Sequence, residues 1–187
     1  MRQLHGKELS FNNLLDMDGA INAASSFDDP CVAIIKHTNP CGLAVRTELI
    51  EAYRQALEGD PVSAYGSVIA VNRPLDLATA EAMAGLFIEV IVAPAFNADA
   101  RQRLERRQNL RLVELPGNWA NRPDPFTSLD YKRVRGGFLV QTLDFDAKDV
   151  RLEVVTKRQP SPEEIADLKF AWKVARHVKS NAIVLAR

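Results

Sequence analysis

Two titratable side chains stand next to each other at the end of an apolar run, and they are the first candidates for chemistry. The run VAII (32–35) is short and rich in β-branched residues, which predicts a buried strand. Lys36 and His37 follow directly, and the breaker residues NPCG (39–42) predict a turn immediately afterwards. In open α/β sheets the ligand crevice lies just beyond the carboxyl ends of the strands, so this position predicts a candidate site.

The Lys36–His37 pair has a catalytic interpretation and a structural one. A neighbouring ammonium group disfavours imidazolium, so a neutral His37 would accept a proton as a general base. Lys36 would then stabilise the charge that develops on a substrate oxygen or a leaving nitrogen. The alternative is a solvated lysine–histidine pair at a strand end, because a general base needs a positioned proton that a sequence does not reveal.

Cys41 follows His37 by four residues and also has two interpretations, a thiol nucleophile or a small apolar residue packed in the turn. The neighbouring proline and cysteine raise the question of a zinc deaminase. That signature needs H-x-E and then P-C-x-x-C. None of the three histidines is followed by the required glutamate, and Cys41 lacks a cysteine partner at the required spacing. We therefore expect no metal.

Three further positions admit a ligand or a plain structural role. Gly66 ends the small, polar loop DPVSAYG (60–66) and would let a ligand approach the backbone, although a simple turn also fits. Glu89 precedes an apolar strand and would accept hydrogen bonds from ribose hydroxyls, or remain a solvated carboxylate. Asn181, after Ser180, would bond a ligand amide or cap the last helical carbonyls.

Composition limits the class of protein. The 187 residues are 47% hydrophobic and 26% charged, which is ordinary globular usage, and the formal net charge is zero. A neutral chain argues against a nucleic-acid or membrane partner, and no apolar run is long enough to span a bilayer. The four arginines between 101 and 107 are interleaved with acidic residues, which predicts a solvated helix face. Two cysteines give no disulfide framework, so we expect a cytoplasmic location.

Alternating strands and helices must position these side chains. The predicted helices cover 14–24, 49–57, 80–87, 98–108 and 161–179, and the predicted strands cover 32–35, 67–71, 90–93, 111–115, 136–141, 152–156 and 182–185. Residues 116–135 hold three prolines and no clear period, which predicts a loop. This order predicts one domain over 1–187 of class α/β, a three-layer α/β/α arrangement with a mixed, mainly parallel sheet.

Several side chains are predicted to begin or bury these helices. Thr47 is a plausible N-cap for the second helix. Ser161, Pro162 and Glu164 form a capping box with proline at the first position of the last helix. The predicted buried stripes are Leu14, Leu15, Ala20, Ile21 and Ala24 in the first helix, Leu49, Ile50, Tyr53, Ala56 and Leu57 in the second, and Ile165, Leu168, Trp172 and Ala175 in the last.

Six segments, taken in order, resemble one known family. They are LSFNNLLD (9–16), IIKHTNPCG (34–42), DPVSAYG (60–66), VIVAPAF (90–96), RGGFLVQ (135–141) and FAWKVARHVKSNAIV (170–184). Together they resemble the transformylase part of the bifunctional aminoimidazole carboxamide ribonucleotide (AICAR) transformylase/IMP cyclohydrolase family. Two departures are conservative: the family usually has Tyr where Phe11 stands and Phe where Tyr65 stands.

The resemblance implies a cytidine-deaminase-like fold without zinc and a formyl transfer from 10-formyltetrahydrofolate to the amine of AICAR. It assigns proton acceptance to His37 and transition-state stabilisation to Lys36, and AICAR contacts to Gly66, Glu89 and Asn181. Some relatives carry Asp at the position of Glu89. The family also implies a homodimer in the full-length protein, with active sites formed between two subunits.

Several parts of the family pattern lie outside this sequence. They are the segments RYGxNPHQ and GxGxGQxSR, the cyclohydrolase domain and the second half of the transformylase. The family takes most of its phosphate and folate contacts from those parts. We therefore expect that this chain alone binds AICAR weakly and turns over poorly or not at all. The alternatives are a non-catalytic folding or dimerisation unit, or another nucleotide-processing enzyme on the same fold.

Overall fold

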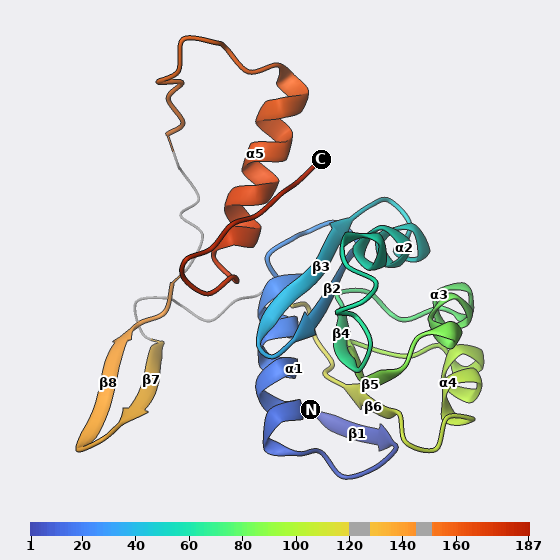
Figure 1. Cartoon of the computed structure of the whole chain (residues 1–187). Coiled ribbons are helices and arrows are strands. Elements are labelled where there is room, and N and C mark those ends of the chain that lie inside the picture. Colours follow the sequence, from blue (N-terminus) through green and yellow to red (C-terminus); the bar gives the residue numbers. More distant parts are fainter. Residues whose placement is uncertain (120–127, 145–150) are drawn as a thin grey trace.

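The apolar runs of the first 115 residues become neighbouring strands of one sheet. The computed structural model of the chain describes residues 1–119, 128–144 and 151–187. Its central sheet has six strands in the order β1-β6-β5-β4-β2-β3 (Figure 1). Their bounds are β1 (Arg2–His5), β2 (Cys31–Lys36), β3 (Asn39–Val45), β4 (Ser67–Val71), β5 (Ile88–Ala93) and β6 (Arg111–Glu114). The predicted strands at 32–35, 67–71, 90–93 and 111–115 are confirmed.

The sheet is mixed, as predicted, but its parallel part is smaller than predicted. Strands β4, β5 and β6 run parallel to one another. Strand β2 runs antiparallel to both of its neighbours, β3 and β4, and β1 runs antiparallel to β6. The difference arises because β1 lies in a polar stretch without a strand pattern, and because β2 and β3 form a hairpin. The order of strands along the chain does not reveal this reversal.

Helices cover both faces of the sheet, which confirms the three-layer α/β/α arrangement. Helix α1 (Phe11–Ala24) packs on one face, against β2 and β4. Helices α2 (Leu49–Gly59), α3 (Leu77–Ala82) and α4 (Ala98–Glu105) belong to the other layer, with a short 3₁₀ turn over Met83–Gly85. Successive β2 side chains point to opposite faces, so Ile34 lies in the core under α2, and Ile35 lies in the core under α1.

In the first two helices, the sequence pattern predicts some of the buried residues correctly and others wrongly. Helix α1 begins at a capping box between Ser10 and Asn13, and it buries Met17 together with small alanines, which bring the helix close to the sheet. Leu14 and Leu15, predicted to be buried, are exposed. Helix α2 buries Leu49, Tyr53 and Ala56 as predicted. Its N-cap position is Glu48, so the predicted cap at Thr47 is wrong.

The NPCG segment (39–42) does not form the predicted turn. The chain reverses one step earlier, at His37 and Thr38, and NPCG begins β3. Pro40 is tolerated there because β3 is an edge strand, next to a register shift between Ile34 and Ile35. A Cβ atom on Gly42 would lie 1.8 Å from the Ala56 carbonyl oxygen. Gly42 therefore serves the close contact between β3 and α2, not a turn.

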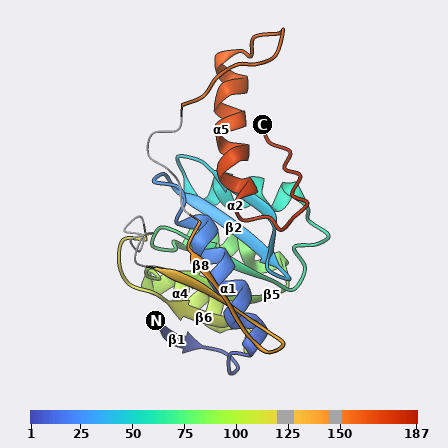
Figure 2. The same cartoon turned by 90° about the vertical axis from the view of Figure 1, so that its left-hand side faces the viewer.

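The last third of the chain lies beside this body (Figures 1 and 2). Strands β7 (Leu129–Val134) and β8 (Gly137–Thr142) form a separate antiparallel hairpin. Strand β8 confirms the predicted strand at 136–141. The predicted loop over 116–135 is wrong at its end, because 129–134 is β7, and its residues 120–127 lie outside the described ranges. The predicted strands at 152–156 and 182–185 are also wrong, since neither stretch pairs with a strand.

Helix α5 (Pro162–Ala175) begins where the sequence predicts but packs differently. The capping box between Ser161 and Glu164 is present, with proline in the first turn. Leu168 and Trp172 of the predicted buried stripe are 61% and 70% exposed, and only Val174 of this helix is buried. The predicted stripe is wrong because α5 meets the body mainly at its carboxyl end. There the ring of Phe170 lies 5.4 Å from that of Phe27, beside the end of α1.

Candidate functional site

The candidate residues gather at one edge of the sheet. Lys36 ends β2, while Gly66 and Glu89 stand at the amino ends of β4 and β5. Because β2 is antiparallel to β4, its carboxyl end meets the amino ends of the parallel strands. The candidate site thus lies at the end opposite to the usual crevice of a parallel sheet. Lys36 does stand at the carboxyl end of its strand, as predicted. The rule that places a ligand crevice beyond the carboxyl ends of the strands holds here for β2, but not for the parallel strands.

Lys36 and Gly66 are brought together directly. The Lys36 ammonium group donates a hydrogen bond to the backbone carbonyl of Tyr65. A Cβ atom on Gly66 would lie 4.0 Å from the Lys36 Nζ and 3.6 Å from the ring of Phe87. Gly66 has a φ of +73°, which favours glycine, and its N–H donates to the Phe87 carbonyl at 2.8 Å. The glycine therefore keeps the space beside the ammonium group open.

His37 stands on a tight, unusual turn next to this ammonium group. His37 and Thr38 have φ values of 54° and 63°, and their side chains are exposed and half-buried respectively. A positive φ costs a non-glycine residue about 1 to 3 kcal/mol, so other contacts must hold the turn. The side chain of Asp16 accepts a hydrogen bond from the Thr38 N–H at 2.7 Å. The imidazole of His37 is thereby presented to solvent at the edge of the sheet.

The carboxylate of Glu89 is not simply solvated. An ion pair occupies one of its two oxygens, so only the other is free for a ligand. Its Oε2 accepts from Arg111 Nη1 at 2.6 Å, and the Arg111 side chain is only 12% exposed. Arg111 also donates through Nε to the Glu8 carbonyl at 3.0 Å. This pair crosses from β5 to β6 at the same edge as Lys36. An ion pair so placed fixes the position of one carboxylate oxygen of Glu89.

Asn181 is exposed, and the chain just before it reaches the turn at His37. The backbone N–H of Lys179 donates to Asn39 Oδ1 at 3.1 Å, and the Lys179 ammonium lies 3.5 Å from the His37 carbonyl oxygen. The structure therefore brings the segment at 179–181 to the same edge as Lys36 and His37. Sequence reasoning missed Asp16, Asn39, Lys179 and Arg111 at this site. The first three lie inside the segments LSFNNLLD, IIKHTNPCG and FAWKVARHVKSNAIV, which is the only signal they gave.

Cys41 fits the packed interpretation better than the nucleophilic one. Its thiol is half-buried, and its Sγ lies 3.4 Å from the Ile34 carbonyl oxygen, to which it donates. Burial, and secondarily the negative charge of Asp60, raise the pKa of Cys41 to about 11. A thiol with such a pKa is almost entirely protonated at neutral pH. Among the described residues, no group of three or more His, Cys, Asp or Glu side chains could hold a metal ion.

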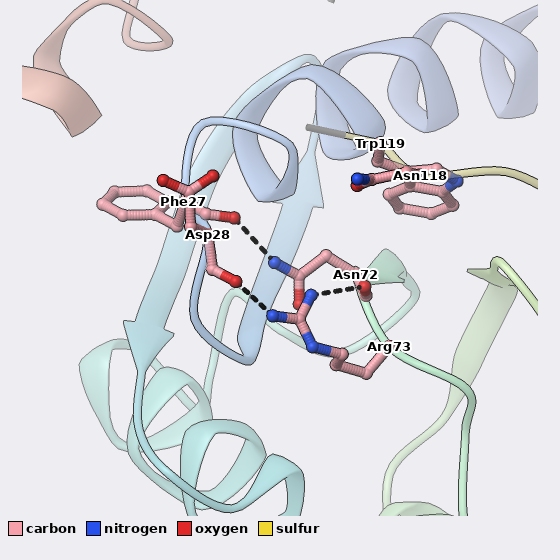
Figure 3. A pocket seen from close by; sticks show the side chains of 6 residues that line it. All are labelled: Phe27, Asp28, Asn72, Arg73, Asn118 and Trp119. Carbon is pink, nitrogen blue, oxygen red and sulfur yellow. Dashed lines mark hydrogen bonds between the residues drawn. The ribbon is translucent and has the colours of Figure 1, made fainter. Parts of the chain in front are cut away.

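A pocket lies at the opposite end of the strands from Lys36 (Figure 3). This pocket of about 280 Å³ is lined by Phe27, Asp28, Asn72, Arg73, Asn118 and Trp119. The Asn72 amide donates to the Phe27 carbonyl at 2.9 Å, and Arg73 donates to the Asp28 carbonyl and to the Asn72 carbonyl. These bonds tie the loop before β2 to the end of β4. The polar groups here serve the fold and are separate from the Lys36 edge.

The sequence of the whole chain matches a known class of protein. Residues 1–187 match the family model of the AICARFT/IMPCHase bienzyme, and the chain belongs to that family. A relative from Thermoanaerobacter sp. (strain X514), the bifunctional purine biosynthesis protein PurH, is 46% identical over 186 residues. The match covers 99% of this chain and 35% of the relative, so the chain spans about a third of that protein. The resemblance found in the sequence is confirmed at the level of this bienzyme family.

The described residues include no helix that is long and apolar enough to cross a membrane.

Proposed function

We propose that this chain carries the Lys36–His37 part of an AICAR transformylase site. The reaction transfers a formyl group from 10-formyltetrahydrofolate to the amine of AICAR in purine biosynthesis. Support comes from the family match, and from a relative whose name describes a bifunctional enzyme of purine biosynthesis. The single observation that carries the proposal is the Lys36 ammonium beside Gly66, next to the exposed His37, at one edge of the sheet.

The chemistry divides between two side chains. The aromatic amine of AICAR is a weak nucleophile, so His37 takes its proton as the amine attacks the formyl carbon. The bond from the formyl carbon to the folate nitrogen then breaks, and Lys36 stabilises the charge that develops on that nitrogen. The carbonyl of Tyr65, which accepts from the Lys36 ammonium, keeps the lysine at the edge of the sheet.

Three residues are proposed to contact AICAR. Gly66 leaves room for the substrate beside Lys36, and the Glu89 oxygen that Arg111 does not occupy accepts from ribose hydroxyls. Asn181 bonds the carboxamide, because the chain at Lys179 already reaches the His37 turn. Both the folate and AICAR are co-substrates in this proposal, and it requires no metal. The proposed fold class is cytidine-deaminase-like, supported by the three-layer arrangement around a mixed sheet.

The whole enzyme is proposed to be a cytoplasmic homodimer. Exposed apolar side chains on β7, β8 and α5 support this, because patches of that kind are usually covered by other protein. They are Leu129, Tyr131, Phe138, Leu139, Val140, Leu168 and Trp172. The same surfaces favour a second candidate function, a folding or assembly unit whose site is incomplete. In either case the isolated 187-residue chain is expected to bind AICAR weakly and to turn over poorly or not at all.

Calorimetric titration with AICAR tests the proposal on the chain itself. We expect weak heats that disappear in Lys36→Ala, because the ammonium group is the charged group nearest to Gly66. Arg46→Ala is the matched control, since Arg46 is exposed and follows β3 at the end of the sheet opposite to Lys36. Wild-type chain that gives no heat with AICAR would favour the assembly unit. Measurable formyl transfer by the 187-residue chain, lost in His37→Ala, would contradict the expectation that the chain alone turns over poorly.

A further inference from the structure

The turn between β2 and β3 holds a conformation that its own residues disfavour. The hairpin closes with the pair Lys36–Asn39, so its loop has only two residues. Both of them, His37 and Thr38, have positive φ, and such loops usually carry Asn-Gly or Asp-Gly. Thr38 is β-branched, which makes the left-handed region especially unfavourable. The turn therefore depends on contacts from outside the hairpin, and its position beside Lys36 makes that dependence relevant to function.

Asp16, on helix α1, supplies one of these contacts from outside the hairpin. Its Oδ1 accepts the Thr38 N–H at 2.7 Å, across 22 residues of sequence. Asp16 is half-buried on α1, directly before the buried Met17, and α1 packs tightly on β2. The carboxylate is thus held by a helix whose start is fixed at the Ser10 capping box. A hydrogen bond to a charged acceptor so constrained is a strong restraint on the turn.

The other end of the same peptide group is also bonded. The His37 carbonyl oxygen accepts from Thr38 Oγ1 at 2.7 Å, and it lies 3.5 Å from both the Lys179 ammonium and the Asn39 amide nitrogen. The peptide plane between His37 and Thr38 is therefore held at its oxygen and at its N–H. Holding that plane restrains the backbone of His37 and, with it, the Cα–Cβ bond that carries the exposed imidazole.

We propose that Asp16 is a positioning residue for His37, acting through the Thr38 N–H and not through contact with substrate. This inference rests on the proposed transformylase function, in which the imidazole takes a proton from the AICAR amine. A general base must stand within hydrogen-bond reach of that proton, so a loose turn lowers the rate of proton transfer. Because Asp16 does not touch AICAR, its loss changes kcat and leaves the KM for AICAR nearly constant.

The test uses a chimera in which this chain replaces its matching segment in the Thermoanaerobacter relative. Asp16→Ala removes the acceptor, and we expect kcat for formyl transfer to fall about tenfold to hundredfold with KM changed less than about twofold. Asp16→Asn keeps a carbonyl oxygen that accepts the same bond, so its kcat stays within about threefold of the unsubstituted chimera. Asp18→Ala is the matched control: Asp18 lies on the same helix but bonds Asn22 and not the turn.

The outcomes distinguish a failure of the Asp16 positioning role from a failure of the proposed transformylase function. Formyl transfer that survives His37→Ala contradicts the catalytic role of His37 itself. Activity that is lost in His37→Ala but unchanged in Asp16→Ala overturns the positioning role alone, as does an Asp16→Asn variant as impaired as Asp16→Ala. A second arm needs neither turnover nor a stable alanine variant. In the unsubstituted 187-residue chain the Thr38 amide should exchange at least about tenfold more slowly than a solvent-exposed amide, and exchange at the free rate overturns the inference.

Discussion

The two turn residues His37 and Thr38 carry a local conformational cost in the candidate site. Each adopts the left-handed backbone region, which costs a non-glycine residue about 1 to 3 kcal/mol. A glycine at either position would remove that cost. Glycine at the first position would also remove the imidazole. The carboxylate of Asp16 and the segment at Lys179 hold the turn instead, so a strained backbone and an exposed imidazole occur together.

Cys41 gives a prediction that tests the packed interpretation of its thiol. Because burial, and then Asp60, raise the pKa of Cys41 to about 11, only about a thousandth of it is thiolate at pH 8. We expect iodoacetamide to alkylate the folded chain far more slowly than the chain unfolded in guanidinium chloride. The rate is measured by mass spectrometry. Labelling of Cys41 in the folded chain at the rate of a free thiol would contradict the interpretation.

The same raised pKa predicts how stability changes in alkaline solution. The folded chain holds its Cys41 proton more tightly than the unfolded chain, whose thiol has a pKa of about 8.5. The resulting stabilisation is complete below pH 8.5 and is lost as the pH rises towards about 11. Guanidinium unfolding at pH 7, 9 and 10.5 measures it, with Cys41→Ala as the comparison. A pH dependence that is identical in the two proteins would show that Cys41 does not contribute.

Gly42 provides the sharpest prediction about how the elements pack. A methyl group at this position would meet the Ala56 carbonyl oxygen at 1.8 Å, so β3 and α2 would have to separate. We expect Gly42→Ala to lower the free energy of unfolding by about 2 to 4 kcal/mol. Gly85→Ala is the matched control, because nothing lies within 4 Å of its added Cβ. Denaturant unfolding that gives equal stabilities for the two variants would disprove the close contact.

The start of α5 should respond to acid. Arg158 donates two hydrogen bonds to the Glu164 carboxylate at 2.9 Å, and the Ser161 N–H donates a third. These bonds, those from Arg158 first, lower the pKa of Glu164 to about 2. Their contribution is therefore present above pH 4.5 and is lost as the pH falls towards 2.

Amide exchange at the first turn of α5 measures this loss. We expect the protection of these amides, measured against the intrinsic exchange rate at each pH, to fall between pH 4.5 and 2. Glu164→Gln removes the titrating group and should abolish that extra pH dependence. A first turn whose protection is the same at pH 5 and pH 2.5 in the unsubstituted chain would contradict the role assigned to the capping box.

The sequence could predict the layers of the molecule but not the directions of all its strands. Apolar runs such as 67–71 and 90–93 carry a strong strand signal, and the helical stripe of α2 is correctly predicted from Leu49, Tyr53 and Ala56. The hairpin at His37 was missed because its two loop residues are not the Asn-Gly or Asp-Gly pair that marks such a loop, and Thr38 is β-branched. Strand β1 was missed because Arg2–His5 is polar and pairs at the edge of the sheet, where burial does not impose a pattern.

The residues of the candidate site also divide into those that the sequence could predict and those that it could not. Lys36, His37 and Gly66 could be chosen from residue type and position, since each stands where an apolar strand begins or ends. Asp16 and Arg111 could not, because their roles depend on contacts over 22 residues of sequence and on the pairing of β5 with β6. The buried stripe predicted for α5 was wrong for a related reason. Helix α5 does carry these apolar residues, but no surface of the described chain packs against the stripe.

Formyl transfer by the chimera, with single substitutions at the site, tests the central claim most directly. The unsubstituted chimera should transfer formyl groups from 10-formyltetrahydrofolate to AICAR. His37→Ala and Lys36→Ala should each lower kcat at least about a hundredfold, because one removes the proton acceptor and the other the positive charge at the leaving nitrogen. Arg46→Ala, at the opposite end of the strands, should leave the rate unchanged. Full activity in the His37→Ala and Lys36→Ala chimeras would contradict the account.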